Sequence, residues 1–141
     1  NRCTFDISAN AKPTLREERD WTNINYPDLN AVIHCSYKVV NHDLRELGDD
    51  AQEFAYKHAG KAAAISEQAF DNNDADVHCI FYRLSGNTAS PFQFYATDST
   101  RHFFRGAVYF NCVPNQDSLQ PSIDYIQKDV IRLIESLRWI D

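Results

Sequence analysis

The dipeptide His-Cys occurs twice in the sequence, at His34-Cys35 and at His78-Cys79. Imidazole and thiolate both bind zinc, so these pairs raise the question of a metal site. Both pairs lie in strand-like segments, where neighbouring side chains point to opposite faces, so the two members of one pair cannot bind one ion. His34 and His78 could share a face only if their strands were neighbours in register. We interpret them as ordinary strand residues and expect no metal ion and no cofactor.

Asp98, Ser99 and His102 are the residue types of a nucleophilic triad. They fall in one short turn between two apolar segments, where Asp and Ser are favoured because their side chains hydrogen-bond the nearby backbone. The sequence has no GxSxG nucleophile elbow, and its four glycines form no phosphate-binding loop. We therefore expect no catalytic residue and no enzymatic activity.

The four cysteines are widely spaced, without a CxxC pair: Cys3, Cys35, Cys79 and Cys112. Structural zinc sites usually bring their ligands in close pairs, so this spacing argues against one. Each cysteine lies in a strand-like segment, where a free thiol behaves as a small buried apolar group. Buried free thiols are one interpretation, and a single disulfide is the other, since an export route would permit it.

Aromatic residues make up 13% of the chain, which is more than a small core needs. Core packing is one explanation, and an exposed patch that docks a protein partner is the other. The residues concerned are Trp21, Tyr26, Tyr37, Tyr82, Phe92, Tyr95, Phe104, Tyr109 and Trp139.

The totals limit the class of protein. A chain of 141 residues with 43% hydrophobic and 24% charged residues fits one globular domain with a core of its own. A net charge of -6 argues against a nucleic-acid partner, because binding to phosphates needs clustered Lys and Arg. No apolar run is long enough to span a membrane. The chain begins at Asn1 without an initiator Met, which suggests that a targeting segment has been removed.

The first half of the chain predicts strands and one helix. Alternating residues predict strands over 2–8, 21–24 and about 29–40, with a loop over 9–20. In the long strand, Ile33, Cys35, Tyr37 and Val39 point one way and His34, Ser36 and Lys38 the other. Apolar residues at steps of three and four then predict a helix from Leu44 to Ile65, ended by the Asp71–Asp74 cluster.

The second half predicts three strands and a final helix. Strands are predicted over 77–84, 92–97 and 103–112, with a turn around Asp98-Ser99-Thr100. Asp117 and Gln120 fit a capping box for the final helix, with Pro121 in its first turn. Trp139 and Ile140 follow its end and are predicted to pack against the sheet edge.

These elements predict an α+β fold with a central, mostly antiparallel sheet. Three consecutive strands after a helix can pair as an antiparallel meander. Strands that are apolar on both faces need helices on both faces, which makes an α/β/α sandwich. The same element order occurs in the PsbP/Mog1-like sandwich, which is an analogy of fold alone.

Three segments are distinctive together: WTNINYPDLNAVIHCSYK, AYKHAGKAAAISEQAF and the stretch from FYATDSTRHFFRGAVYF through CVPNQDSLQPSIDYIQKDVIRLIESLRW. With them the chain resembles the gliding motility lipoprotein GldD family of Bacteroidetes, over nearly its whole length. The most specific parts are the TDST turn with the FFRGAVYF strand and the PNQDSL segment, which no generic fold would impose.

The resemblance implies a cell-envelope lipoprotein that faces the periplasm and is anchored by an acylated cysteine upstream of this chain. It also implies a functional link to the gliding and type IX secretion machinery, whose envelope proteins would be its partners. The membrane would be contacted only through the upstream anchor. Cys3 lies in a predicted strand, so we do not expect it to carry the lipid.

We therefore expect residues 1–141 to form a single, noncatalytic periplasmic domain that acts through protein–protein interaction. The alternative is a periplasmic domain that binds a small molecule or a lipid in a cleft beside the sheet. A candidate interaction edge is the TDST turn with nearby basic and aromatic residues: Asp98, Ser99, Thr100, Arg101, Arg105, Trp21 and Tyr26.

Overall fold

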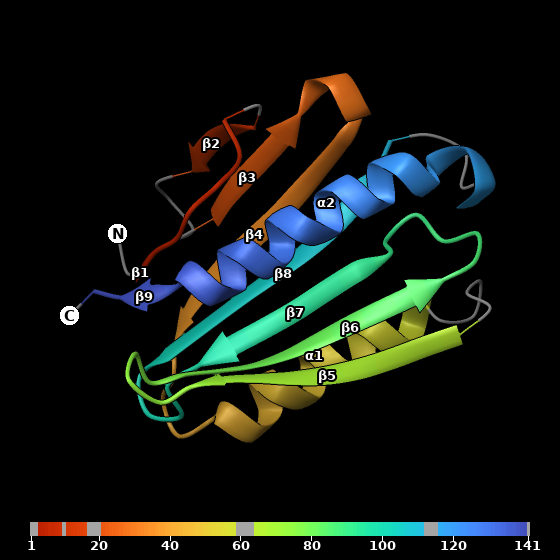
Figure 1. Ribbon diagram of the computed structural model, residues 1–141. Helices are drawn as coiled ribbons and strands as arrows, with labels where there is room; N and C mark the ends of the chain where they lie inside the picture. Colours follow the sequence, from red (N-terminus) through yellow and green to blue (C-terminus); the bar gives the residue numbers. More distant parts are fainter. Residues whose placement is uncertain (1–2, 10, 17–20, 59–63, 112–115, 141) are drawn as a thin grey trace.

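The strands form one large antiparallel sheet (Figure 1). The computed structural model describes residues 3–9, 11–16, 21–58, 64–111 and 116–140. The sheet has the order β2-β3-β4-β8-β7-β6-β5 and antiparallel pairing throughout. Its strands are β2 (Lys12–Arg16), β3 (Trp21–Tyr26), β4 (Ala31–Val39), β5 (Ala64–Asn72), β6 (Val77–Ser85), β7 (Phe92–Thr97) and β8 (His102–Phe110). The prediction of an α+β fold is confirmed.

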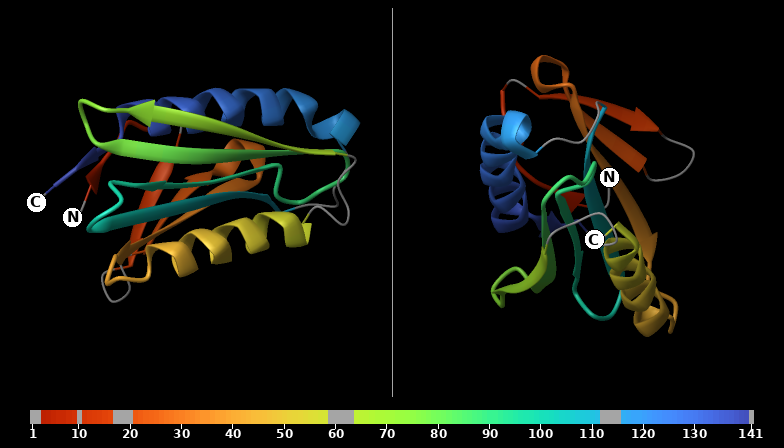
Figure 2. Two further views of the ribbon diagram at one scale, coloured as in Figure 1. Left: turned by 90° about the horizontal axis from the view of Figure 1, so that it is seen from below. Right: turned by 90° about the vertical axis from the view of Figure 1, so that its right-hand side faces the viewer.

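Two helices cover opposite faces of this sheet. α1 (Leu44–His58) packs on β7 and β8, and α2 (Gln116–Ser136) lies on the other side, as Figure 2 shows. The prediction of helices on both faces is confirmed. So is the meander, because β6, β7 and β8 pair in sequence order. The central strands β6, β7 and β8 explain the arrangement, since each presents apolar side chains to both layers.

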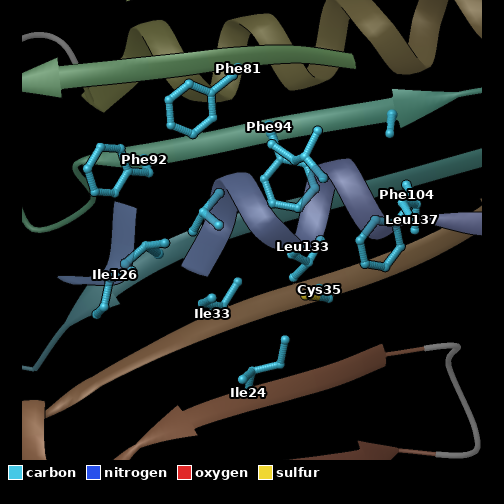
Figure 3. Close-up of a cluster of buried hydrophobic side chains, with 14 of the residues drawn as sticks. Ile24, Ile33, Cys35, Phe81, Phe92, Phe94, Phe104, Ile126, Leu133 and Leu137 are labelled. Carbon is cyan, nitrogen blue, oxygen red and sulfur yellow. The ribbon is translucent and has the colours of Figure 1, made fainter. Parts of the chain in front are cut away.

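The main core lies between the sheet and α2. Phe81, Phe92 and Phe94 fill its centre, and the rings of Phe81 and Phe92 stack 5.6 Å apart (Figure 3). The apolar stripe of α2 meets them with four buried side chains, Ile126, Val130, Leu133 and Ile134, and Leu137 adds a fifth just past the end of the helix. Truncating one of these to Ala would cost about 2–5 kcal/mol, because the surrounding side chains close the gap only in part.

A smaller apolar layer lies between the sheet and α1. Leu47 and Ala51 pack on Phe103, and Ala55 packs with Tyr82 and Leu84. Most of the aromatic residues are thus core residues. Of those singled out by the sequence, Tyr26, Tyr37, Tyr82, Phe92 and Phe104 are buried, while Tyr95, Tyr109 and Trp139 are partly exposed. Core packing explains all of these except Tyr109, which lies in none of the apolar clusters of the described residues, and the side chain of Trp21 lies outside the described residues.

Two edge strands differ from the predictions. The segment over 9–20 was predicted as a loop, but Lys12–Arg16 is strand β2. The first helix was predicted to run to Ile65, but α1 ends at His58 and Ala64–Asn72 is strand β5. Both strands are at an edge of the sheet, where one side has no partner strand and residues need not alternate. Pairing with β3 and with β6 therefore outweighs local preference in both segments.

The two chain ends meet in a second, two-stranded sheet. β1 (Cys3–Thr4) pairs with β9 (Arg138–Trp139), with Cys3 opposite Trp139. The strand predicted over 2–8 is therefore shorter, and residues 5–8 lie along α2 instead. There the carboxylate of Asp6 binds Arg132 at 2.7 Å, and the Ser8 hydroxyl lies 3.0 Å from that of Tyr125.

The start of α2 also differs from the prediction. The helix already includes Gln116 and Asp117, so Asp117 does not precede it as a cap, and Pro121 lies inside the helix rather than in its first turn. Helix ends are the least certain part of a prediction, because several nearby residues can terminate a helix at similar cost.

Candidate interaction surface

The turn between β7 and β8 is held by the side chain of Asp98. Its Oδ1 accepts hydrogen bonds from the backbone N–H groups of Thr100, Arg101 and His102, at 3.0, 2.8 and 2.8 Å. The hydroxyl of Thr97 donates to the carbonyl of His102 at 2.6 Å and accepts from the N–H of Ser99. Ser99 has a φ of 72°, and these bonds hold it in that left-handed conformation. The TDST segment thus forms a turn that is stabilised by hydrogen bonds within residues 97–102.

The environment of Asp98 favours its charged form. Only 8% of the residue is exposed. Burial alone would raise the pKa of its carboxyl, but the backbone N–H bonds from His102, Arg101 and Thr100 outweigh burial and hold the pKa below its usual value. Asp98 therefore stabilises the turn, while Ser99, Thr100 and Arg101 around it are exposed.

His102 lies just beyond this turn, buried among aromatic groups. Its Nδ1 is 2.6 Å from the hydroxyl of Tyr37, and its ring stacks on Trp139 with centroids 4.9 Å apart. The nearer carboxylate oxygen of Asp98 is 4.0 Å from Nε2. The indole N–H of Trp139 donates to the carbonyl of Asp76 at 2.8 Å. The cluster joins β9 to two turns of the large sheet.

The triad suggested by residue types does not form. Asp98 and the Ser99 backbone are used within the turn, and the His102 ring pairs with Tyr37 rather than with a serine. His102 and Tyr37 are only 5% and 7% exposed, so neither is open to a substrate. Asp98, Ser99 and His102 are therefore not arranged as a triad.

The two histidines considered for metal binding are apart. His34 is exposed on β4, with its Nδ1 2.9 Å from the Asn23 side-chain oxygen. His78 on β6 lies 2.8 Å from Asp71 and 3.3 Å from Asp76. The hydrogen bond to Asp71 does most to raise the pKa of His78. Because β8 and β7 separate β4 from β6, His34 and His78 are not on neighbouring strands. Within the described ranges no His, Cys, Asp or Glu side chains form a group that could hold a metal ion.

The described cysteines are free thiols. Cys35 and Cys79 are buried, and Cys3 is partly exposed. Burial raises the pKa of all three thiols, that of Cys3 to about 11. They act as small apolar core groups at neutral pH, and Cys112 lies outside the described residues.

The other residues of the predicted edge do not gather at the turn. Arg105 lies further along β8, where its guanidinium carbon is 4.4 Å from the ring centre of Phe54 on α1. Tyr26 is only 3% exposed and donates its hydroxyl to Asp129 of α2 at 2.8 Å. Burial and this bond raise the pKa of Tyr26. The backbone of Trp21 pairs with Ser36, and its side chain is outside the described residues.

A polar strip on β4 carries side chains that do not belong to the predicted edge. His34, Ser36 and Lys38 share one face, and Ser36 lies opposite Arg105 of β8. His34 and Lys38 are exposed, and Ser36 and Arg105 are partly exposed. The signal was present in the alternation of β4, but the pairing of β4 with β8 was needed to bring Arg105 beside it. We call these four residues the Ser36 patch.

Two depressions lined by described residues are open and mostly polar. One, of about 570 Å³, is lined by Phe70, Asp71, Asn72, Asn73, Asp74, Val77, Ile134 and Glu135. Another, of about 520 Å³, is lined by Phe5, Asp6, Ile7, Ser8, Asp129 and Arg132. Sites for small apolar ligands are usually enclosed and apolar. In the described part of the chain, these depressions offer no support for a lipid-binding cleft.

The comparisons with known proteins identify the family. The family model described as gliding motility lipoprotein GldD matches residues 2–139 of the 141 in this chain. No curated protein matches the chain, and no solved structure does, so the analogy to the PsbP/Mog1-like sandwich stays a prediction. None of the helices in the described ranges is long and apolar enough to cross a membrane. By this match over almost its whole length, the chain belongs to the GldD family of gliding motility lipoproteins.

Proposed function

We propose that this chain is a noncatalytic module of the cell envelope that supports gliding by docking onto other envelope proteins. Its family gives it a role in gliding motility and implies an envelope location with a membrane anchor. Docking is our inference. The observation that supports it is that the side chains of reactive type are already bonded to neighbouring groups of the protein. Asp98, His102 and His78 are each engaged by neighbouring groups, while the exposed polar surface of the sheet is left available for contacts.

We further propose that the domain faces the periplasm and that its partners belong to the gliding and type IX secretion machinery. A lipoprotein without enzymatic activity can support such a machine only by holding or positioning other components. Interfaces of this kind rest on a few well-placed aromatic, Arg or Tyr side chains within a larger contact.

The experiment uses a strain that lacks the gene and is complemented with the full-length lipoprotein. Gliding is measured as colony spreading, secretion as the amount of exported protein in the medium, and contacts by crosslinking in intact cells. We expect loss of gliding in the deletion strain and specific crosslinks to envelope proteins in the complemented strain. Normal gliding without the gene, or no crosslinked protein at any surface position, would overturn the proposal.

Two single-residue variants distinguish docking from catalysis. His102→Gln and Tyr37→Phe change the only buried histidine–tyrosine pair among the described residues without removing the surface of the sheet. If the chain acts by docking, variants that remain folded should restore gliding to the deletion strain. Loss of gliding in a variant that is folded and still crosslinked would favour an enzyme instead.

A further inference from the structure

The Ser36 patch concentrates positive charge on a chain that is negative overall. The strands β2, β3, β4 and β8 are neighbours in the sheet and contain no Asp or Glu. The chain as a whole has 20 acidic residues and a net charge of -6. Within the patch, Lys38 and Arg105 are cationic and His34 adds a ring nitrogen, all around the hydroxyl of Ser36. Such local excess attracts anions despite the opposite net charge.

Arg105 is held in place by an aromatic ring, without an ion pair to any carboxylate of the described residues. Its guanidinium lies over the Phe54 ring at 4.4 Å, which fixes the orientation of a long side chain. Burial lowers the pKa of Arg105, although the nearby charge of Asp50 acts against this. Among the described residues, no carboxylate oxygen forms an ion pair with it. A planar cation held in this way is suited to bind a carboxylate with two hydrogen bonds.

The register places the other groups of the patch around the Arg105 position. Ser36 is directly opposite Arg105, and His34 and Lys38 are the next residues on that face of β4. Side chains that are opposite or diagonal neighbours in antiparallel strands lie within about 5–8 Å of each other. On the far side of His34, the Tyr109 ring lies 5.4 Å from the imidazole. The patch can therefore contact a carboxylate and its neighbouring backbone together.

We propose that the Ser36 patch binds an acidic segment of a partner protein, with Arg105 and Lys38 as its main contacts for carboxylate side chains. This inference rests on the proposed docking function and specifies its surface and the chemistry of the partner. It places the interface on the face of the sheet beside α1 rather than at the TDST turn.

The surrounding charges select a protein over a uniformly anionic surface. α1 borders the patch and carries four exposed carboxylates: Glu46, Asp49, Asp50 and Glu53. A membrane of anionic lipids approaching the patch would meet these carboxylates at the same time and be repelled. A protein can instead present acidic residues to β4 and basic residues to α1, which is the usual form of electrostatic complementarity.

The first experiment uses the purified domain and a deca-glutamate peptide as the probe. Binding is followed by the backbone amide signals in ¹⁵N NMR spectra. We expect shifts for residues of β4 and β8, and a weakening of binding by up to about fivefold in Lys38→Gln and in Arg105→Gln. Arg83→Gln removes the same charge from an exposed site on β6 and should bind like the wild type. Lys38 is exposed, so its variant tests the patch even if Arg105→Gln lowers stability.

Other probes in the same assay separate the sources of negative charge. Inorganic phosphate and vesicles of phosphatidylglycerol should give much weaker effects on β4 and β8 than the peptide. Equal or stronger effects with either probe would overturn the assignment to a protein partner. No change on β4 or β8 at millimolar peptide, or equal weakening by Arg83→Gln, would overturn the patch itself.

The second experiment uses the full-length protein in cells, with a photoreactive amino acid at position 36 and, as a control, at position 83. We expect a crosslink to an envelope protein from position 36 that is lost when Lys38→Glu is added. Identification of the crosslinked peptide should show an acidic segment. If crosslinks arise only elsewhere on the domain, the patch fails and the docking function stands. If no crosslink arises at any position and the deletion strain glides normally, both the patch and the docking function fail.

Discussion

At the scale of single residues, the polar groups that seemed reactive mainly hold the fold together. Asp98 binds three backbone N–H groups, Tyr26 binds Asp129, and His78 lies between Asp71 and Asp76. Residue types alone could not reveal the bond between Tyr26 and Asp129, because these two residues are distant in the sequence. The identity of Asp98 and Ser99 as turn residues was predicted from local chemistry, and the turn is confirmed.

The first prediction concerns Asp98. Asp98→Ala should lower the free energy of unfolding by about 1–3 kcal/mol, because three backbone N–H groups, one buried and two partly buried, lose their acceptor. Urea unfolding followed by circular dichroism measures the loss. Asp74→Ala, an exposed residue of the β5–β6 turn, is the matched control and should change stability little. A small effect of Asp98→Ala would show that water replaces the carboxylate as the acceptor for these N–H groups.

Asp98 also predicts how stability depends on pH. Its pKa is lower in the folded than in the unfolded chain, so the unfolded chain binds the proton first as pH falls. The stabilisation is therefore fully present above the ordinary pKa of 3.8 and is lost below it, through the depressed folded pKa. Unfolding experiments from pH 7 to pH 2 should show a weaker acid dependence in Asp98→Asn. An unchanged dependence would contradict the assignment.

At the scale of elements, local periodicity predicted central strands well and edge strands poorly. β6, β7 and β8 were predicted within a few residues, because they are covered on both faces and bounded by turn residues. β5 was assigned to the helix, since the run of alanines at 62–64 that leads into it favours helix and many of its side chains are exposed. Pro13 in β2 suggested a loop, but an edge strand tolerates Pro where no N–H is needed.

Two glycines predict opposite effects of one substitution. Gly106→Ala should destabilise the domain by about 1–3 kcal/mol, because its methyl group would overlap the buried ring of Phe94. Gly48→Ala in α1 should stabilise it by up to about 1 kcal/mol, since the new Cβ would lie 3.8 Å from the hydroxyl of Tyr95 and Ala favours helix. Thermal unfolding of both variants measures this. A stable Gly106→Ala variant would mean that Phe94 moves aside without cost.

At the scale of the whole molecule, the sheet separates a deep core from a thinner layer. The α2 side holds most of the buried aromatic residues, and the α1 side leaves His34 and Lys38 of β4 exposed. The first and last strands, β1 and β9, pair with each other (Figure 1), and Trp139 of β9 packs on His102. Asymmetry between the two faces is what leaves the Ser36 patch exposed or partly exposed.

The buried thiols report on this core as a whole. In a variant with Cys3→Ser and Cys112→Ser, only Cys35 and Cys79 remain, and both are buried thiols with raised pKa values. We expect them to react with a disulfide reagent in native buffer only as fast as the whole domain unfolds, because no local opening should expose them. The same variant in urea is the control and should react at once. Rapid labelling of the native variant would reveal an opening of the core.

By itself, the sequence determined the class of fold, the central meander, the two covering helices and the family. These features rest on patterns that are repeated along each element or on distinctive segments such as TDSTRHFFRG, so they survive without knowledge of contacts. Only the tertiary structure decided the edge strands, the burial of Tyr26 and the position of Arg105 beside Ser36. The physical reason is that these depend on which strands pair. Strand pairing joins residues far apart in the chain, and local periodicity carries no record of it.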